Sequence, residues 1–409
     1  MTSTPHTGSK EVIQLSIDAT DEKIEVGRVI GDVGDPNEGP TVVVIGGMHG
    51  NEHSGVFALH KIFEILEKDQ LKTKGRLIGL VGNLKALEQR KRFLSRDLNR
   101  LWTVDNMLRL VQNKLNGTAD DPEIKEQVIL YERIRNIINS SNGPFYFIDL
   151  HTTSAESMPF VVINDTLSNR TFALDMPTHV IIGIEEFIDG PLLSFMNEVG
   201  HVSIGFEAGQ HDELSSIENA YDLVWNAMHV TGLLDLELAP RGKEHYTRLK
   251  RSMEGEQMIF EVRERFEVQP KSSFTMKPGF INFQKIHKGE LLAECDGKEL
   301  LAKENGRVFM PLYQTQGVDG YFLIGKVSKF WLGLSSVLRK TRSERILRLL
   351  PGVRKMDKDS HTLVVDRRVA AFLATEIFHI LGYRRKKVAG TKMFFIRRSI
   401  NHPELLSKN

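Results

Sequence analysis

Two short stretches of the sequence place histidine and carboxylate residues directly after apolar runs. In VVVIGGMHGNEHSG, from Val42 to Gly55, a β-branched run stops at two glycines and is followed by His49 and Glu52. In PFYFIDLHTTSAE, the apolar run Phe145–Leu150 ends at His151. A β-branched run bounded by glycine is typical of a buried strand, and open α/β sheets carry their chemistry at strand ends. These three side chains therefore stand where a site is expected.

The residue types at these strand ends match a metal site. His49 and Glu52 are spaced i, i+3, so one helical turn or a tight loop points both side chains to the same side. Two histidines and one glutamate form a common ligand set of catalytic zinc, which leaves a fourth position for water. Parallel strands with crossovers easily span the distance from Glu52 to His151 and would bring the three together. A histidine and a glutamate three apart also occur by chance, so the metal hypothesis depends on the second strand.

Two further carboxylates lie on the predicted strands. Strand alternation places Asp149 on the same face as His151, where it would orient the imidazole; the alternative is an aspartate that caps a turn. In SIGFEAGQH, Glu207 follows a third apolar run. A metal together with a separate general base provides the parts of metal-assisted hydrolysis.

Arginine residues cluster between these strands, in the stretch from Gly82 to Trp102. A cationic metal would repel the side chains of Arg92 and Arg100, so placing them with Asn99 near the metal is electrostatically favourable only if an anion shares the site. The guanidinium group of arginine is well suited to bind a carboxylate. The pattern therefore indicates an anionic substrate. The alternative is that Arg90, Lys91 and Arg92 form a solvated helix face.

The composition indicates a soluble globular protein. With 409 residues, 41% hydrophobic and 26% charged, the chain suggests two domains or one large domain with an appended module. The first ten residues lack an apolar stretch of signal-peptide length, and no apolar run approaches the length of a membrane span, so we expect a cytoplasmic protein. The single cysteine, Cys295, excludes an internal disulfide and a thiolate metal site, so a metal would need histidine and carboxylate ligands.

The order of the predicted elements indicates an α/β fold with a mostly parallel or mixed sheet flanked by helices. Predicted strands and helices alternate up to about Leu238. The strands are expected over 12–17, 24–30, 76–81, 145–150, 179–184 and 202–206, and the helices over 52–68, 122–139 and 214–234. We expect a catalytic domain over 1–240, a smaller β-rich domain with regular glycine turn signals over 241–327, and a C-terminal extension over 328–409 with helices at 345–350 and 367–381.

The net charge of +1 hides an asymmetry. From Lys326 to Asn409 there are 20 Lys and Arg against 6 Asp and Glu, and the rest of the chain has 34 against 47. A basic extension of this kind either recruits an acidic partner or packs on its own acidic body.

Four motifs together carry a family resemblance. They are HGNE at His49–Glu52, DLNR at Asp97–Arg100 after the pair Arg92 and Phe93, DLH at Asp149–His151, and FEAGQ at Phe206–Gln210. In order and rough spacing, over residues 40–240, the chain resembles the succinylglutamate desuccinylase and aspartoacylase family, which belongs with the zinc carboxypeptidases. Residues up to about Val327 resemble the family's β-rich C-terminal domain less distinctly.

This resemblance implies a zinc carboxypeptidase-like fold and one Zn²⁺ per chain, bound by His49, Glu52 and His151. It implies that Glu207 activates a zinc-bound water, because zinc lowers the pKa of that water toward about 7. Arg92 would polarise the scissile carbonyl, and Asn99 and Arg100 would bind a substrate carboxylate. The implied reaction is hydrolysis of the amide bond in a small anionic N-acylated amino acid or related compound.

One departure from the family pattern bears on the substrate. Aspartoacylase-like members have an arginine about ten residues before the catalytic glutamate, whereas LLSFMNEVGHVSIGFE, ending at Glu207, contains none. N-acetylaspartate is therefore a doubtful substrate: either another basic residue fills the role of this arginine, or the natural substrate lacks the second anion. We expect specificity to reside in loops over 159–168 and 185–191.

An alternative from another class is a binding or scaffold protein whose basic extension engages an acidic partner. The completeness of the set of catalytic residue types speaks against this alternative. We expect no membrane span and no nucleic-acid partner, and whether the chain forms a homo-oligomer stays open.

Overall fold

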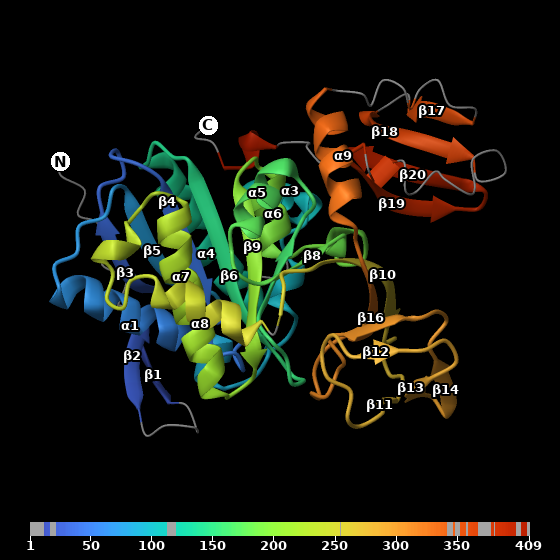
Figure 1. The fold of residues 1–409 in the computed structure, drawn as a ribbon, viewed down its shortest axis with the longest axis horizontal. Helices are drawn as coiled ribbons and strands as arrows, with labels where there is room; N and C mark the ends of the chain where they lie inside the picture. The colour runs from blue at the N-terminus through green and yellow to red at the C-terminus, as the bar shows by residue number, and fades with distance from the viewer. Residues whose placement is uncertain are drawn as a thin grey trace.

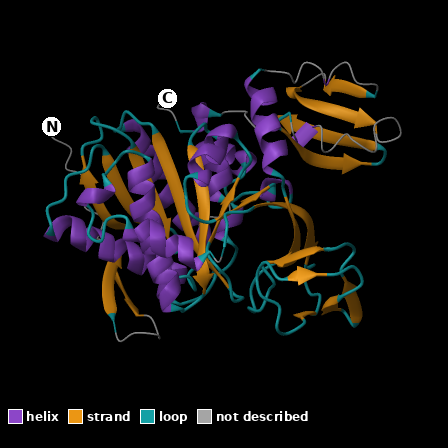
Figure 2. Ribbon diagram, viewed as in Figure 1, coloured by secondary structure: helices purple, strands orange, loops and turns teal. Residues whose placement is uncertain are grey.

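The computed structural model describes residues 12–16, 22–112, 120–253, 255–341, 347, 352–356, 359–366, 378–379, 381–397 and 402–406. An eleven-stranded mixed sheet runs through the molecule and is flanked by helices (Figures 1 and 2). Its strand order is β12-β15-β16-β10-β8-β7-β9-β6-β4-β5-β3. The α/β class with a mixed, helix-flanked sheet is therefore confirmed.

The centre of the sheet is parallel, as expected for strands that alternate with helices. It consists of β5 (Arg76–Val81), β4 (Thr41–Gly46), β6 (Phe145–Thr153) and β9 (Val202–Gln210). The sheet is mixed because antiparallel pairs flank this parallel centre: β3 (Val29–Gly34) pairs with β5, and β7 (Phe160–Ile163) pairs with β9. β8 (His179–Ile182) continues in parallel from β7. A separate hairpin of β1 (Val12–Ser16) and β2 (Lys23–Gly27) precedes the sheet.

The central strand β4 shows why the sheet needs helices on both faces. All six of its residues are buried, and Val42 and Val44 belong to one hydrophobic cluster while Val43 and Ile45 belong to another. Successive side chains of a strand point to opposite faces, so both faces of the sheet must be covered. Because both faces of β4 are buried, its sequence is a continuous apolar run and does not alternate between apolar and polar residues.

Helices provide that cover. They are α1 (Ser54–Lys68), α2 (Leu84–Glu88), η1 (Leu98–Arg100), α3 (Val104–Val111), α4 (Pro122–Asn139), α5 (Leu167–Leu174), η2 (Ile184–Glu186), α6 (Leu192–Glu198), α7 (Leu214–Val230), η3 (Leu236–Leu238) and α8 (Glu244–Ser252). The start of α4 follows from its sequence, since Asp121 Oδ1 accepts hydrogen bonds from the backbone N–H of Glu123 and Ile124, and Pro122 occupies the first turn. Within the described part of the chain, none of the helices has the length and apolar character that crossing a bilayer requires.

The β-rich region after residue 241 continues the main sheet. Its strands are β10 (Ile259–Glu267), β11 (Phe274–Met276), β12 (Lys285–Ile286), β13 (Leu291–Cys295), β14 (Lys298–Leu301), β15 (Gly306–Phe309) and β16 (Asp319–Lys326). β10 pairs in parallel with β8, and β16 and β15 follow, whereas β11, β13 and β14 form a small sheet of their own. The proposed boundary near residue 240 thus crosses one continuous sheet.

The C-terminal extension forms a further α and β unit. It contains α9 (Lys329–Lys340), the sheet β17-β18-β20-β19, and the short helix η5 (Pro403–Leu405). The sheet strands are β17 (Val353–Met356), β18 (Asp359–Asp366), β19 (Tyr383–Ala389) and β20 (Lys392–Arg397). Figure 1 shows this sheet beside α9. The helices expected over 345–350 and 367–381 lie almost entirely outside the described residues.

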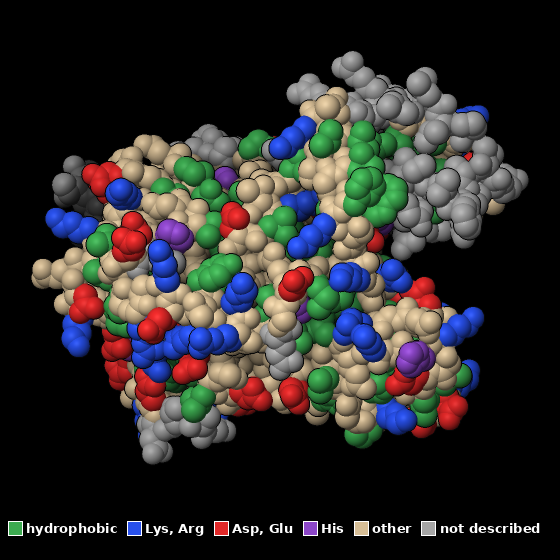
Figure 3. Space-filling model, in the orientation of Figure 1, with side chains coloured by type: hydrophobic (Ala, Val, Ile, Leu, Met, Phe, Trp, Pro, Cys, Tyr) green, Lys and Arg blue, Asp and Glu red, His purple; other side chains and the backbone are tan. Residues whose placement is uncertain are grey.

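Charged side chains connect the extension to the helices and loops that cover the main sheet. Arg339 Nη2 lies 2.8 Å from Asp165 Oδ2, and Arg384 Nη2 lies 2.9 Å from Glu198 Oε1. On the face drawn in Figure 3, acidic and basic side chains are interspersed. These two ion pairs favour the alternative in which the basic extension packs on its own chain, and recruitment of an acidic partner stays open.

Leu405 anchors the C-terminal segment in the core beneath the main sheet. Its side chain is 2% exposed in the cluster that includes Val43 and Ile45, and its carbonyl oxygen accepts a 2.6 Å hydrogen bond from Tyr131 Oη. We expect Leu405→Ala to lower the free energy of unfolding by about 2–5 kcal/mol, because it leaves a cavity in this cluster. Glu404→Ala, at an exposed neighbour, should change it by no more than about 0.5 kcal/mol. Denaturant titration measures both, and equal stability of the two variants would contradict the anchoring role.

Candidate active site

A tight loop between β4 and α1 carries the first two candidate ligands. The N–H of Glu52 donates to the carbonyl oxygen of His49 at 3.1 Å, and α1 begins only at Ser54, so the i, i+3 pair lies in a loop and not on the helix predicted from residue 52. Gly50 permits this loop, because a Cβ added there would lie 2.1 Å from the backbone carbonyl carbon of Ala86. The HGNE motif therefore has a steric reason for its glycine.

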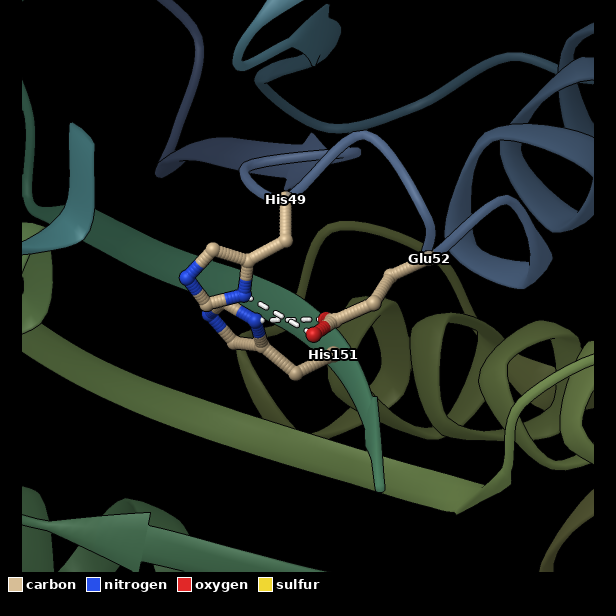
Figure 4. Close-up of side chains that lie close together, drawn as sticks. All are labelled: His49, Glu52 and His151. Atoms are coloured by element: carbon tan, nitrogen blue, oxygen red, sulfur yellow. Dashed lines mark hydrogen bonds and ion pairs between the residues drawn. The ribbon is translucent and has the colours of Figure 1, made fainter. Parts of the chain in front are cut away.

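The three predicted ligands come together at the ends of β4 and β6. His49 Nδ1 lies 2.8 Å from Glu52 Oε1, and His151 Nδ1 lies 2.9 Å from Glu52 Oε2 (Figure 4). All three residues are buried, and one donor atom from each lies within 4.8 Å of the others. Two imidazoles and one carboxylate converging in this way could hold a metal ion, and the set fits zinc, which prefers nitrogen and oxygen donors from three protein residues at catalytic sites.

A carboxylate lies behind each histidine. His151 Nε2 lies 2.8 Å from Asp149 Oδ2, which confirms that the two side chains share a face of β6. His49 Nε2 lies 3.1 Å from Asp97 Oδ1. Such outer partners fix the ring orientation of metal-binding histidines. The role of Asp97 was missed from the sequence, although the DLNR motif contains it.

Electrostatics keep the central carboxylate ionised. Burial alone would raise the pKa of Glu52, but the neighbouring His49 and His151 hold it well below its usual value. Burial disfavours the charged form of His151, yet Asp149 and Glu52 outweigh it and raise the pKa of His151 well above its usual value. The group thus presents a charged carboxylate between two oriented imidazoles.

Glu207 lies next to His151 on the neighbouring strand. The two residues are direct register partners in the parallel pair of β6 and β9, and Glu207 is 8% exposed. Burial raises its pKa to about 8, and among the described residues its Oε2 has no hydrogen-bond partner. A buried carboxyl with a spare oxygen beside a potential metal site is suited to proton transfer.

Arg92 reaches the same group from the loop after α2. Its Nη1 lies 3.4 Å from Glu52 Oε1 and its Nη2 lies 3.2 Å from Asp97 Oδ2. The Nε of Arg92 is buried and has no hydrogen-bond partner within the described part of the chain. The helix face considered as the alternative for Arg90–Arg92 does not form, because α2 ends at Glu88 and Arg90 has a φ of +50°.

Asn99 and Arg100 both line the pocket, but their side chains are engaged differently. Asn99 is 5% exposed, and its Oδ1 accepts a 2.8 Å hydrogen bond from Leu192 N while its Nδ2 lies 3.2 Å from His151 Nε2. Arg100 Nη2 lies 2.7 Å from Asp319 Oδ2 in β16. The binding of a substrate carboxylate by these two residues stays a prediction. The carboxylate of Asp319, whose contact with Arg100 was not predicted from the sequence, would compete for that arginine.

The β-rich region builds one wall of the pocket. Gln314 Oε1 accepts a 2.9 Å hydrogen bond from Asn51 Nδ2, within the HGNE motif. The prediction of a loop over 159–168 is mostly wrong, because residues 160–163 form β7 and α5 starts at Leu167. Val162 nevertheless lines the pocket, from β7. From the other expected loop, Ile188 and Pro191 line it.

Comparison with known proteins agrees with this architecture. Residues 38–218 match the sequence profile of the succinylglutamate desuccinylase/aspartoacylase catalytic domain. A probable aspartoacylase from Acaryochloris marina (strain MBIC 11017) is 29% identical over 142 residues, which are 34% of this chain and 43% of that protein. An N-acyl-aromatic-L-amino acid amidohydrolase (carboxylate-forming) from Xenopus laevis is 26% identical over 285 residues, 64% of this chain and 87% of that protein.

The likeness extends to solved structures. The crystal structure of a succinylglutamate desuccinylase/aspartoacylase from Rhodobacter sphaeroides superimposes with a TM-score of 0.54 at 19% identity, and covers 79% of this chain and 95% of that one. At this identity the match shows the fold alone. The chain also spans less than half the length of the aspartoacylase relative named above.

Fold and site together define an α/β protein with a buried His–Glu–His group, able to bind a metal ion, at the ends of its central strands. Residues 38–218 of the chain are similar to the catalytic domain of the succinylglutamate desuccinylase/aspartoacylase family. The resemblance stated from the four motifs is thereby confirmed.

Proposed function

We propose that this chain is a zinc-dependent amidohydrolase that cleaves the amide bond of a small N-acylated amino acid or a related carboxylate-bearing amide. The observation that carries the proposal is the position of Glu207, a buried carboxyl beside the converging His49, Glu52 and His151. Relatives named as aspartoacylase and as an N-acyl amino acid amidohydrolase support the substrate class.

In this proposal His49, Glu52 and His151 hold the zinc ion. When bound, zinc would lower the pKa of water and polarise a carbonyl group. Asp97 and Asp149 keep the two imidazoles turned so that their Nδ1 atoms face Glu52. The donor set is thus preorganised by groups on β6 and in the loop before η1.

Glu207 moves the proton. Hydrolysis forms a C–O bond to the acyl carbon and breaks the C–N bond, and the departing nitrogen must gain a proton. A buried carboxyl beside the donor set can take a proton from the attacking water and return it to the amine.

Arg92 and Arg100 bind the substrate. Arg92 lines the pocket, and its guanidinium would stabilise the carbonyl oxygen as negative charge develops there. Arg100, further along the pocket, supplies a guanidinium for the carboxylate of the substrate. The apolar pocket residues, such as Val162 and Leu193, exclude water from the rest of the ligand.

The test is release of free amine from a panel of N-acetyl amino acids. The purified chain loaded with zinc is expected to release amine, to lose this activity on treatment with a chelator, and to recover it when zinc is added back. Zinc bound at about one ion per chain without any amine release across the panel would contradict the proposal.

A further inference from the structure

Asp319 forms an ion pair with Arg100, the arginine that is expected to bind a substrate carboxylate. It is the first residue of β16, and its Oδ2 lies 2.7 Å from Arg100 Nη2. Its Oδ1 lies 2.6 Å from Arg265 Nε in β10. The side chains of Asp319 and Arg265 are only 17% and 15% exposed, so solvent and salt screen this contact less than they screen a surface ion pair. Asp319 therefore places a negative charge in the candidate site before any ligand enters.

Arg265 would retain Asp319 if Arg100 turned toward a ligand. Its Nη1 donates a 2.7 Å hydrogen bond to the carbonyl oxygen of Phe187, which fixes the guanidinium independently of Arg100. Arg100 is 24% exposed, and its Nε has no hydrogen-bond partner among the described residues. Arg100 can thus exchange one carboxylate for another without leaving Asp319 unpaired.

The rest of the pocket offers little to a second anion. The other arginine that lines it, Arg92, already faces Glu52 and Asp97. In the stretch before Glu207 that contains no arginine, Leu193 lines the pocket, and Ile188, Met310 and Leu312 add further apolar surface. A second carboxylate placed against these side chains would lose its hydration without gaining a paired cation.

We propose that Asp319 is a specificity-determining residue, which competes with the substrate carboxylate for Arg100 and so favours amides that have one carboxylate and an apolar group over amides that have two carboxylates. The proposal rests on the amidohydrolase function proposed above. It concerns the choice of substrate, and the reaction itself does not depend on it.

Asp319→Asn tests this role, because it removes the charge and keeps the size of the side chain. N-acetylleucine and N-acetylaspartate serve as the substrates with one and two carboxylates, in the zinc-loaded protein. We expect the KM of N-acetylleucine to fall about fivefold with kcat unchanged, and the kcat/KM ratio of N-acetylaspartate to N-acetylleucine to rise about tenfold. Asp319→Glu, which restores the charge, should return the ratio toward that of the unmodified protein.

Glu267→Gln is the matched control. Glu267 Oε1 lies 3.3 Å from Arg265 Nη2 and its side chain is 54% exposed, so this variant removes a charge from the same arginine without contacting Arg100. We expect its KM values to stay within about twofold of those of the unmodified protein. If Glu267→Gln changed the KM values as much as Asp319→Asn does, the effect would come from the loss of any nearby negative charge. That result would overturn the specific role of Asp319.

Calorimetric titration with leucine and aspartate gives a second readout that does not depend on turnover. The unmodified protein should bind aspartate no more tightly than leucine, and Asp319→Asn should bind aspartate about tenfold more tightly than before. Tighter binding of aspartate by the unmodified protein overturns the proposal even if Asp319→Asn does not fold. A folded Asp319→Asn with unchanged affinities and an unchanged substrate ratio overturns it as well.

The outcomes separate the two proposals. If the unmodified protein hydrolyses neither amide, the amidohydrolase function fails for these substrates, and the titration still decides whether Asp319 limits carboxylate binding. If the unmodified protein hydrolyses N-acetylleucine and Asp319→Asn shows no shift in either readout, only the role of Asp319 fails.

Discussion

Glu207→Gln is expected to lower kcat by about a hundredfold to ten-thousandfold while the protein still binds zinc. The amide keeps the shape of the side chain but can no longer take a proton from water. Glu207 is not among the three converging donors, so its replacement should leave them in place. Stopped assays of amine release give kcat, and elemental analysis of the purified protein gives the zinc content.

Glu213→Gln is a suitable control for this variant, because Glu213 is exposed and follows β9 three residues after Gln210. Its kcat should stay within about twofold of that of the unmodified protein, as for most exposed positions away from a site. Loss of zinc in Glu207→Gln, or full activity in it, would contradict the separation of metal binding from proton transfer.

His151→Ala is expected to abolish zinc binding and turnover together. It removes one of three donors and leaves Glu52 Oε2 without its 2.9 Å neighbour. The loss of zinc affinity should exceed the roughly tenfold to hundredfold loss typical of replacing an outer partner, which we expect for Asp149→Asn. Equilibrium competition with a chelator of known affinity measures both.

His229→Ala controls for the loss of a histidine elsewhere, since His229 is exposed at the end of α7. It should keep one zinc per chain and full activity. If His151→Ala kept its zinc in the same competition, the metal would have to bind at other residues, and the assignment of the ligand set would be wrong.

The site could be predicted from the sequence where a short motif coincides with a strand end. His49, Glu52 and His151 converge as expected because β4 and β6 are adjacent parallel strands whose carboxyl ends meet at one edge of the sheet. Elements with a clear local apolar pattern were predicted with the correct limits, as for strand β5 at 76–81 and helix α4 at 122–139. Local pattern was sufficient for these elements.

The sequence did not reveal elements that depend on distant contacts. β7 has only four residues between polar stretches, so its apolar run is too short to distinguish a central strand from a loop. Asp319 contacts Arg100 across 219 positions, and no local pattern indicates that an acidic residue at the start of β16 faces the pocket. The run at 24–30 was expected as one strand, whereas the chain turns at Arg28 and forms parts of β2 and β3.

The position of Leu405 has a consequence for biosynthesis. Residues of β4, β5 and β6 share a hydrophobic cluster with Leu405 and Leu406, which the ribosome adds more than 200 residues after β6. Domains usually fold as they emerge, but this cluster stays open on one side until residue 406 has left the exit tunnel. We therefore expect the nascent chain to expose apolar surface throughout the synthesis of the β-rich region and the extension. A ribosome-bound chain stalled before residue 402 should bind chaperones more strongly than the same chain fused at residue 409 to a linker long enough to bring residue 406 out of the tunnel.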